Sequence, residues 1–481
     1  MSYATQMLFI LPELVLTLGS LALMLAAAWG GQAATRAISY ASVALLAGAG
    51  IALFGPASSG GMAFDGLWRA DAFGAFAKVL IYIASAVAIL IAPRFFAETS
   101  GDDLRPEYPV LMLLAAVGMG MMVSAADLLT LYVGLELQSL AAYVLASFMR
   151  RDQRSAESGL KYFILGALAS GILLYGISLV YGFSGTTLYT GIASAYAAGT
   201  STGLLFGLVF VFAGLAFKIA AVPFHMWTPD VYEGAPTPVT LSFASAQKVA
   251  AVALALRVAI EAMGPASADW RQIVIFAALA SIILGAVAAI GQKNIKRLLA
   301  YSSINNVGFA LVGLAAATEQ GVAAVLTYMV IYVVMTLGSF LVVLQMRGAD
   351  GQPVEDIASL SGMSRTRPAL ALALAMFMFS LAGIPPLFGF YAKFAVFDAA
   401  VQAGLFPLAV IGIAASVIGA YYYLRIVKTM YFDDAAPAFA PSDSHVEKGL
   451  IAVSAVFVSP LGYLLIPALS AASLTAARAL F

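Results

Sequence analysis

The sequence predicts an all-α polytopic membrane protein, and three observations carry this prediction. Hydrophobic residues make up 62% of the 481 residues. Asp, Glu, Lys and Arg make up 10%, against about 25% in soluble domains. The apolar residues stand in long charge-free runs, of which the longest covers residues 162–217. Because a membrane-spanning helix needs about 20 apolar residues, these runs predict helices that cross a bilayer.

Turn-forming residues between the runs divide the chain into fourteen predicted helices. The Gly-, Ser- and Thr-rich stretch 182–203 splits the longest run into two spans joined by a polar loop. No basic segment precedes the first helix, so we expect this helix to be retained and not cleaved as a signal peptide. The helices are expected at residues 7–28, 37–55, 73–93, 108–126, 128–148, 159–182, 204–232, 239–261, 270–291, 297–317, 321–346, 369–398, 404–430 and 449–475.

Basic residues in the loops support this count and predict an orientation. Lys and Arg collect in cytoplasmic loops. The loops after odd-numbered helices hold fourteen of them, including Arg150, Arg151 and Arg154, whereas the loops after even-numbered helices hold only Arg69 and Arg271. We therefore expect the odd loops in the cytoplasm and both termini on the outer side of the membrane.

Composition also excludes several kinds of chemistry. The chain has no Cys, and its two His are His225 and His445. Cys-bound Fe–S clusters, Cys-based zinc sites and disulfides are thereby excluded, and a pair of membrane-embedded His ligands for haem is missing. Neither of the glycine-rich motifs typical of nucleotide-binding sites, G-x-G-x-x-G and G-x-x-x-x-G-K-S/T, stands in a suitable context. A net charge of zero argues against binding of nucleic acid. We expect no metal and no cofactor in this chain.

Seven basic residues lie in or near the predicted spans, and their depth separates them. A charge at the bilayer centre costs about 2.5–3.5 kcal/mol, whereas one near a helix end can snorkel to water. Lys78, Arg257 and Arg425 lie within two turns of a helix end, so we expect them to snorkel. Arg257 can also pair with Glu261 one turn further on. Glu13, near the start of the first helix, is expected to complement the helix dipole.

Four ionisable residues lie deeper in the spans. Glu136, Lys218, Lys248 and Lys393 belong to helices five, seven, eight and twelve. A buried ion pair that only joins helices would explain one acid and one base, but not one acid and three bases. Intramembrane ionisable groups usually mark ion or proton paths. Ammonium groups repel Na⁺, while a lysine changes its proton affinity readily with desolvation, so this set favours H⁺.

Helices seven and twelve are expected to be broken. Pro223 and Pro229 interrupt the first, and glycines and prolines between 383 and 389 interrupt the second. Each is fourth in a block of five helices, and matched interruptions are typical of inverted-repeat transporters. Two independent kinks are the alternative. We therefore expect helices 1–3 at 1–107, inverted five-helix repeats at 108–262 (helices 4–8) and 263–431 (helices 9–13), and helix 14 at 432–481.

Three further residues have two interpretations each. His225, two residues after Pro223, is either a neutral histidine bonded to a freed carbonyl or a proton gate, since histidine titrates nearest neutral pH. Glu157 and Lys161 form an i,i+4 pair at the predicted cytoplasmic start of helix six. They are either a solvated helix end or a proton entry site, and we favour the entry site.

Three segments resemble the antiporter-like membrane subunits of proton-pumping NADH:quinone oxidoreductase (complex I). One is Leu-Glu-Leu-Gln-Ser-Leu around Glu136, and the others are Phe-Lys-Ile-Ala-Ala-Val-Pro-Phe-His-Met-Trp-Thr-Pro-Asp-Val-Tyr-Glu-Gly-Ala-Pro-Thr-Pro from Phe217 and Lys-Arg-Leu-Leu-Ala-Tyr-Ser-Ser-Ile-Asn-Asn-Val-Gly from Lys296. The resemblance covers helices 4–13 and is greatest to the N-type subunits. The largest type has a long lateral helix, which we do not expect here because the sequence stops shortly after predicted helix fourteen, and the middle type typically has glutamate at the position of Lys393.

The resemblance implies a non-redox, proton-translocating subunit in a bacterial inner membrane. Such a subunit moves H⁺ from cytoplasm to periplasm through a buried relay of water, Glu136, Lys218, Lys248 and Lys393, coupled to quinone reduction elsewhere. It implies NADH, FMN, Fe–S clusters and quinone in partner subunits, which include an M-type antiporter-like subunit and small membrane subunits. The alternatives are an Mrp-type or stand-alone cation/proton antiporter, and a purely structural membrane spacer.

Overall fold

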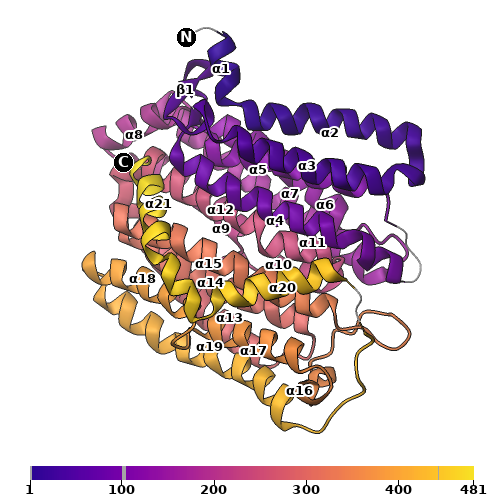
Figure 1. Cartoon of the computed structure of the whole chain (residues 1–481). Helices are drawn as coiled ribbons and strands as arrows, with labels where there is room; N and C mark the ends of the chain where they lie inside the picture. The colour runs from indigo at the N-terminus through magenta and orange to yellow at the C-terminus, as the bar shows by residue number, and fades with distance from the viewer. Residues whose placement is uncertain (1–2, 100–103, 442–443) are drawn as a thin grey trace.

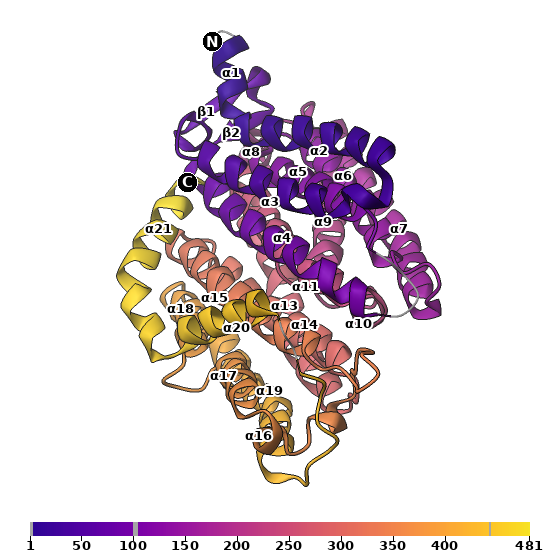
Figure 2. The ribbon, with the colours of Figure 1, turned by 45° about the vertical axis from the view of Figure 1, so that its right-hand side comes forward.

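The computed structural model describes residues 3–99, 104–441 and 444–481, most of which are helical (Figure 1). Within these residues twelve helical stretches are long and apolar enough to cross a membrane. Figures 1 and 2 show the long helices running roughly side by side. The all-α polytopic prediction is therefore confirmed. The stretch Leu11–Ala52 joins two helices, and predicted helix twelve consists of two short halves, so the number fourteen stays a prediction.

The N-terminal helices form one side of the bundle, and a small hairpin joins two of them. Strands β1 (Gly61–Ala63) and β2 (Trp68–Ala70) pair antiparallel in a loop for which the sequence predicted no strand. The Asp71 side chain then caps the fourth helix by accepting a hydrogen bond from the Gly74 N–H. The helices of this part are α1 (Tyr3–Phe9), α2 (Leu11–Gly30), α3 (Thr35–Ala52) and α4 (Ala72–Glu98).

The next block contains the first of the two broken helices. Its segment 182–203 is not a simple polar loop as predicted, because it holds a short helix of its own, α8. Predicted helix eight is also divided at Ser245, and it ends in the π-helical turn Val258–Ala262. The helices are α5 (Glu107–Ser124), α6 (Leu128–Ala146), α7 (Gln153–Ser184), α8 (Tyr189–Ala198), α9 (Thr202–Ile219), α10 (Trp227–Gly234), α11 (Thr237–Ala244) and α12 (Ala246–Arg257).

The second block contains the second broken helix, and the C-terminal segment follows it. Predicted helix fourteen was wrong as a single rod, because Pro460 begins the 3₁₀ turn Pro460–Leu465 and divides it. The helices are α13 (Ser267–Ile290), α14 (Ile295–Ala316), α15 (Glu319–Leu344), α16 (Met363–Thr366), α17 (Pro368–Ala382), α18 (Phe388–Gln402), α19 (Phe406–Phe432), α20 (His445–Val458) and α21 (Ile466–Arg478).

Both predicted breaks are present, and they have the same construction. Helix α9 ends at Ile219 and is followed by Ala220 with φ 61°, while α17 ends at Ala382 and is followed by Gly383 with φ 80°. A cis peptide bond lies three residues further on in both, before Pro223 and before Pro386. The helix resumes as α10 in the first block and as α18 in the second. Both blocks therefore contain a broken helix, while the inverted repeats and their boundaries stay a prediction.

The core of the molecule lies where the two blocks meet. The apolar stretch of α11 and α12 is fully buried, and α14 and α15 are nearly so, whereas α2 and α3 are mostly exposed. Charged side chains in the central helices are therefore shielded by protein. Apolar side chains on α2 and α3 face outward, as expected of helices in contact with lipid.

Candidate functional site

Two of the predicted lysines bind the helix ends that the breaks create. The Lys248 ammonium donates to the Ile219 carbonyl at 2.8 Å, and the Lys393 ammonium donates to the Ala382 carbonyl at 3.0 Å. Both side chains are buried. The last carbonyls of a helix lack partners and carry partial negative charge. The breaks therefore supply a local partner for each buried ammonium group.

Aromatic rings complete the surroundings of these two lysines. Lys248 Nζ lies 5.7 Å from the centre of the Trp227 ring, and Lys393 Nζ lies 4.5 Å from the centre of the Phe309 ring. Ring faces attract cations within about 6 Å. Neither lysine forms an ion pair with a carboxylate within the described part of the chain, and a helix-end carbonyl and a ring face are the partners found for each ammonium.

Lys218 lies in the last turn of α9 and faces α6. Its ammonium donates to the Ser139 hydroxyl at 2.6 Å. Glu136 is one turn before Ser139 on the same face of α6, within electrostatic reach of Lys218. The Glu136 Oε1 atom is buried and has no hydrogen-bond partner among the described residues. Glu136 and Lys218 therefore lie near one another without forming a direct ion pair.

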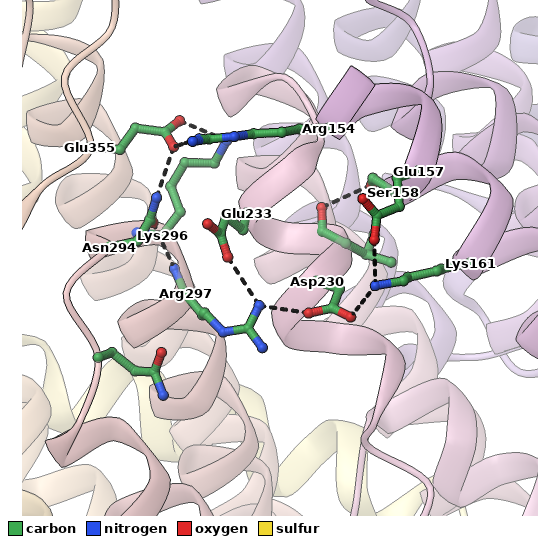
Figure 3. Close-up of polar contacts among 12 residues, drawn as sticks. Arg154, Glu157, Ser158, Lys161, Asp230, Glu233, Asn294, Lys296, Arg297 and Glu355 are labelled. Carbon is green, nitrogen blue, oxygen red and sulfur yellow. Dashed lines mark hydrogen bonds and ion pairs between the residues drawn. The ribbon is translucent and has the colours of Figure 1, made fainter. Parts of the chain in front are cut away.

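The predicted pair of Glu157 and Lys161 is present at the start of α7. Lys161 Nζ lies 2.7 Å from Glu157 Oε1 and also 2.7 Å from Asp230 Oδ2 (Figure 3). All three side chains are partly exposed. Asp230 belongs to α10, the short helix that follows the first break. Asp230 is not among the site residues predicted from the sequence, although its position near Glu233 in the Pro-rich segment was a usable signal.

The two longer segments of the family resemblance meet at this end of the bundle. Arg297 Nη1 lies 2.6 Å from Asp230 Oδ1 and 3.0 Å from Glu233 Oε2 (Figure 3). The neighbouring Lys296 ammonium donates to the Ala235 carbonyl at 2.7 Å. Arg297 and Lys296 begin α14, whereas their partners belong to α10 and the turn after it. The start of α14 is therefore tied to the helix that follows the first break.

A loop carboxylate extends the same cluster. Glu355 lies 3.1 Å from Lys296 Nζ and 3.8 Å from Arg154 Nη1, and it accepts a hydrogen bond from Asn294 (Figure 3). Burial by itself raises the pKa of the Glu355 carboxyl. The Lys296 ammonium and the Asn294 hydrogen bond outweigh burial, so that its pKa lies below the ordinary value. Arg154, Lys296 and Glu355 also line a cavity of about 630 Å³ between the two blocks.

His225 lies between the first break and α10. Its ring is half-buried, and Nδ1 has no hydrogen-bond partner among the residues described. Its backbone carbonyl accepts a hydrogen bond from the Thr228 N–H, at the start of α10. Both interpretations of His225 stay open.

Helix α14 carries a row of buried polar side chains that was not predicted. In the sequence this row lies between Lys248 and Lys393. Ser303 accepts a hydrogen bond from the Tyr332 hydroxyl at 2.9 Å, and Asn306 accepts one from the Tyr328 hydroxyl at 2.6 Å. Asn306 is one turn before Phe309, over whose ring Lys393 lies. Uncharged polar residues in an apolar helix carry little signal in a single sequence, because any one of them is satisfied easily by a neighbour.

The prediction that Lys78 and Arg257 snorkel to water was wrong. Lys78 is 1% exposed, and its ammonium lies 2.6 Å from Glu13 Oε1. Arg257 is fully buried between Asp71 at 2.8 Å and Glu261 at 2.7 Å, so its predicted pairing with Glu261 is confirmed. Closeness to a helix end did not imply exposure, because neighbouring elements cover these ends. The third residue expected to snorkel, Arg425, is partly buried and donates to the Ile290 carbonyl.

The described residues contain no group of three or more His, Asp or Glu side chains able to hold a metal ion. The ammonium, carboxylate and imidazole groups of the site can bind and release protons, whereas its guanidinium groups stay protonated.

Comparison with known proteins identifies the family. A family profile described as the transmembrane region of the NADH:quinone oxidoreductase/Mrp antiporter family matches residues 125–419. A protein of Rhizorhabdus wittichii named NADH-quinone oxidoreductase subunit N is 70% identical over 482 residues, covering 100% of both chains. The chain belongs to the subunit N family. Its relative from Sphingopyxis alaskensis is 62% identical, with 98% of each chain covered.

Chains of solved structures share the fold of this chain. A chain of respiratory complex I from Thermus thermophilus with bound aureothin superposes with a TM-score of 0.81 at 32% identity, covering 95% of this chain and 99% of that one. A chain of the Mrp complex from Dietzia sp. has a TM-score of 0.82 at 21% identity, covering 100% of both chains, which shows a shared fold. The resemblance drawn from the three segments is thereby confirmed.

Proposed function

We propose that this chain is a non-redox membrane-arm subunit of NADH:quinone oxidoreductase that carries H⁺ across the membrane. Its partners would be the other membrane-arm subunits, including an M-type antiporter-like subunit, with NADH, FMN, Fe–S clusters and quinone held elsewhere in the complex. The relay residues would be Glu136, Lys218, Lys248 and Lys393, joined by water. Family membership supports the role in the complex, and the geometry of the lysines supports the relay.

The observation that carries the proposal is the binding of Lys248 and Lys393 to the carbonyl ends of the two broken helices. A charged ammonium offsets the partial negative charge of a helix end, and a neutral amine does so far less. Protonation of each lysine is therefore linked to how its helix end is stabilised. This gives the chain two sites that hold or release a proton according to small movements at a break.

We propose a direction that follows from the predicted orientation. Protons would enter where Glu157 and Lys161 lie, on the cytoplasmic side, and reach Lys218, whose charge is favoured by Glu136 nearby. They would pass Lys248, and the buried hydroxyl and amide groups of α14 would support water between Lys248 and Lys393, before exit to the periplasm. Moving one charge against 100 mV costs about 2.3 kcal/mol, so quinone reduction in partner subunits must supply the energy.

The test is to neutralise one relay lysine in the assembled complex and measure protons pumped per NADH oxidised in sealed vesicles. Lys218→Ala and Lys393→Met are expected to lower this ratio at normal assembly. The matched control is Lys428→Met, because Lys428 is an exposed lysine outside the relay. A wild-type ratio in both relay variants would refute the relay. Normal pumping together with altered assembly would instead support the structural spacer.

An Mrp-type or stand-alone antiporter is the second candidate, favoured by the shared fold of the Mrp complex and by the family profile, whose description names both kinds of protein. The two candidates differ in their partners. We expect NADH-oxidising subunits to purify with this chain from native membranes. Isolation without such subunits, together with cation-dependent H⁺ exchange in vesicles, would favour the antiporter.

A further inference from the structure

Asp230 has two charged partners on opposite sides, from different blocks of helices. Its Oδ2 atom lies 2.7 Å from Lys161 Nζ on α7, and its Oδ1 atom lies 2.6 Å from Arg297 Nη1 on α14 (Figure 3). Helix α10, which carries Asp230, packs against both α7 and α14. One carboxylate therefore joins the predicted proton entry pair to the second block.

The position of α10 depends on such side-chain contacts. The helix has eight residues and lies between the break that follows α9 and the turn at Ala235 and Pro236. Non-helical backbone on both sides leaves it without a continuous helical connection to its neighbours. Side chains at the start of α7 and α14 therefore contribute directly to where α10 lies.

The same short helix also contacts one relay lysine and the residue before another. Trp227 at its start stacks on Tyr162 of α7 with ring centres 4.5 Å apart, and its indole N–H donates to the Phe217 carbonyl beside Lys218. Lys248 Nζ lies over the Trp227 ring. Since Asp230 follows Trp227 by three residues, the two side chains lie on the same side of α10. A shift of α10 at Asp230 would move a ring that borders Lys248 and is hydrogen-bonded to the residue before Lys218.

The charged groups around Asp230 have different abilities to titrate. Arg297 stays protonated in proteins, so it holds Asp230 in its charged form. Lys161 and Glu157 from α7, Tyr301 from α14 and Glu233 from α10 can titrate, and α11 contributes no titratable group. When Lys161 gives up its proton, two carboxylates lose their shared counter-ion, and only Arg297 still neutralises Asp230.

We propose that Asp230 is a positioning residue for proton uptake, which holds the Lys161 ammonium ready and transmits its loss to α10. Arg297 of the second block holds the Asp230 carboxylate in place. Protonation or deprotonation of Lys161 in the first block therefore affects the contacts of both blocks. This inference rests on the proposed function, because it assumes that Lys161 loads protons for the relay. It adds a residue to that function and a mechanical link between the two blocks.

The test compares Asp230→Asn with Glu233→Gln in the assembled complex. Both residues lie on α10 and bind Arg297, but Glu233 makes no contact with Lys161. The readout is protons pumped per NADH oxidised as the pH on the uptake side is raised. A lysine with one carboxylate partner fewer holds its proton less firmly, so the alkaline limb should move by roughly half a pH unit towards acid in Asp230→Asn. Glu233→Gln should keep the wild-type profile.

A conservative variant guards against a folding defect. Asp230→Glu keeps the charge and is expected to restore the wild-type pH profile. An Asp230→Asn complex that assembles poorly but keeps the wild-type profile would overturn the inference, because it would show a role in assembly alone. Equal shifts in Asp230→Asn and Glu233→Gln would overturn it too.

Failure of this inference is distinguishable from failure of the proposed function. If Lys218→Ala and Lys393→Met both keep the wild-type pumping ratio, the relay itself is wrong, whatever Asp230→Asn does. If they lower the ratio while Asp230→Asn has the wild-type pH profile, the relay stands and only the role of Asp230 is wrong.

Discussion

The buried ion pair between Glu13 and Lys78 gives the sharpest test of the packing. Their side chains are 7% and 1% exposed, and Glu13 Oε1 lies 2.6 Å from Lys78 Nζ. Lys78 Nζ also lies 4.9 Å from the centre of the Trp68 ring. A Cβ atom at Gly120 would lie 2.6 Å from Glu13 Oε1, so the absence of a side chain at Gly120 leaves room for the carboxylate. The pair is therefore enclosed by protein on several sides.

Removing one partner of such a pair leaves a buried charge without compensation. The cost of doing so is about 3–5 kcal/mol, which is at least a hundredfold in the unfolding equilibrium since about 1.4 kcal/mol corresponds to tenfold. We expect Glu13→Gln and Lys78→Met each to destabilise the protein by this amount. The double variant should recover most of the loss, because replacing both members of a buried pair by neutral groups is often nearly neutral.

The assay is reversible unfolding of the purified chain in mixed detergent micelles, followed by circular dichroism. Lys428→Met serves as the surface control, because Lys428 is 63% exposed in its pair with Asp433 and exposed pairs are worth about 0–1 kcal/mol. A single variant within 1 kcal/mol of wild type, or a double variant as unstable as the two single variants combined, would refute the reasoning.

Three further predictions follow from other contacts. Arg257→Leu leaves the buried carboxylates of Asp71 and Glu261 with Arg69 alone, at 3.6 and 3.1 Å, so the unfolding free energy should fall by about 3 kcal/mol in the same assay, the low end for a broken buried pair. Gly389→Ala places a Cβ atom 2.0 Å from the Ser380 carbonyl oxygen, and the forced movement at the second break should cost about 1–3 kcal/mol. Glu355 has a pKa below its ordinary value of 4.5, so its pair with Lys296 stabilises the fold above that value, and the contribution is lost as the pH falls through the lower, folded-state pKa. Glu355→Gln should therefore flatten the acid limb of stability measured against pH, and an unchanged acid limb would contradict the sign.

Much of the fold followed from local features of the sequence. Charge-free apolar runs predicted the spans. In the bilayer the backbone groups of a span must form hydrogen bonds within the helix, and its side chains must be mostly apolar. Pro223 and the glycines and prolines around Pro386 predicted both breaks for a similarly local reason. Helix α8 and the division of predicted helix fourteen at Pro460 were not predicted. Short helices inside loops and breaks near helix ends depend on the residues that pack beside them.

The sequence by itself determined that three lysines lie deep in the spans, since depth is set by distance along a helix. Only the tertiary structure decided what each charge contacts. Lys248 binds a carbonyl of a different helix, Lys161 finds Asp230 69 residues away, and Lys78 is enclosed with Glu13 where its position near a helix end predicted water. Contacts of this kind depend on which helices pack together. Helix packing depends on the shape and charge of complete helix surfaces, and no single segment of the sequence contains that information.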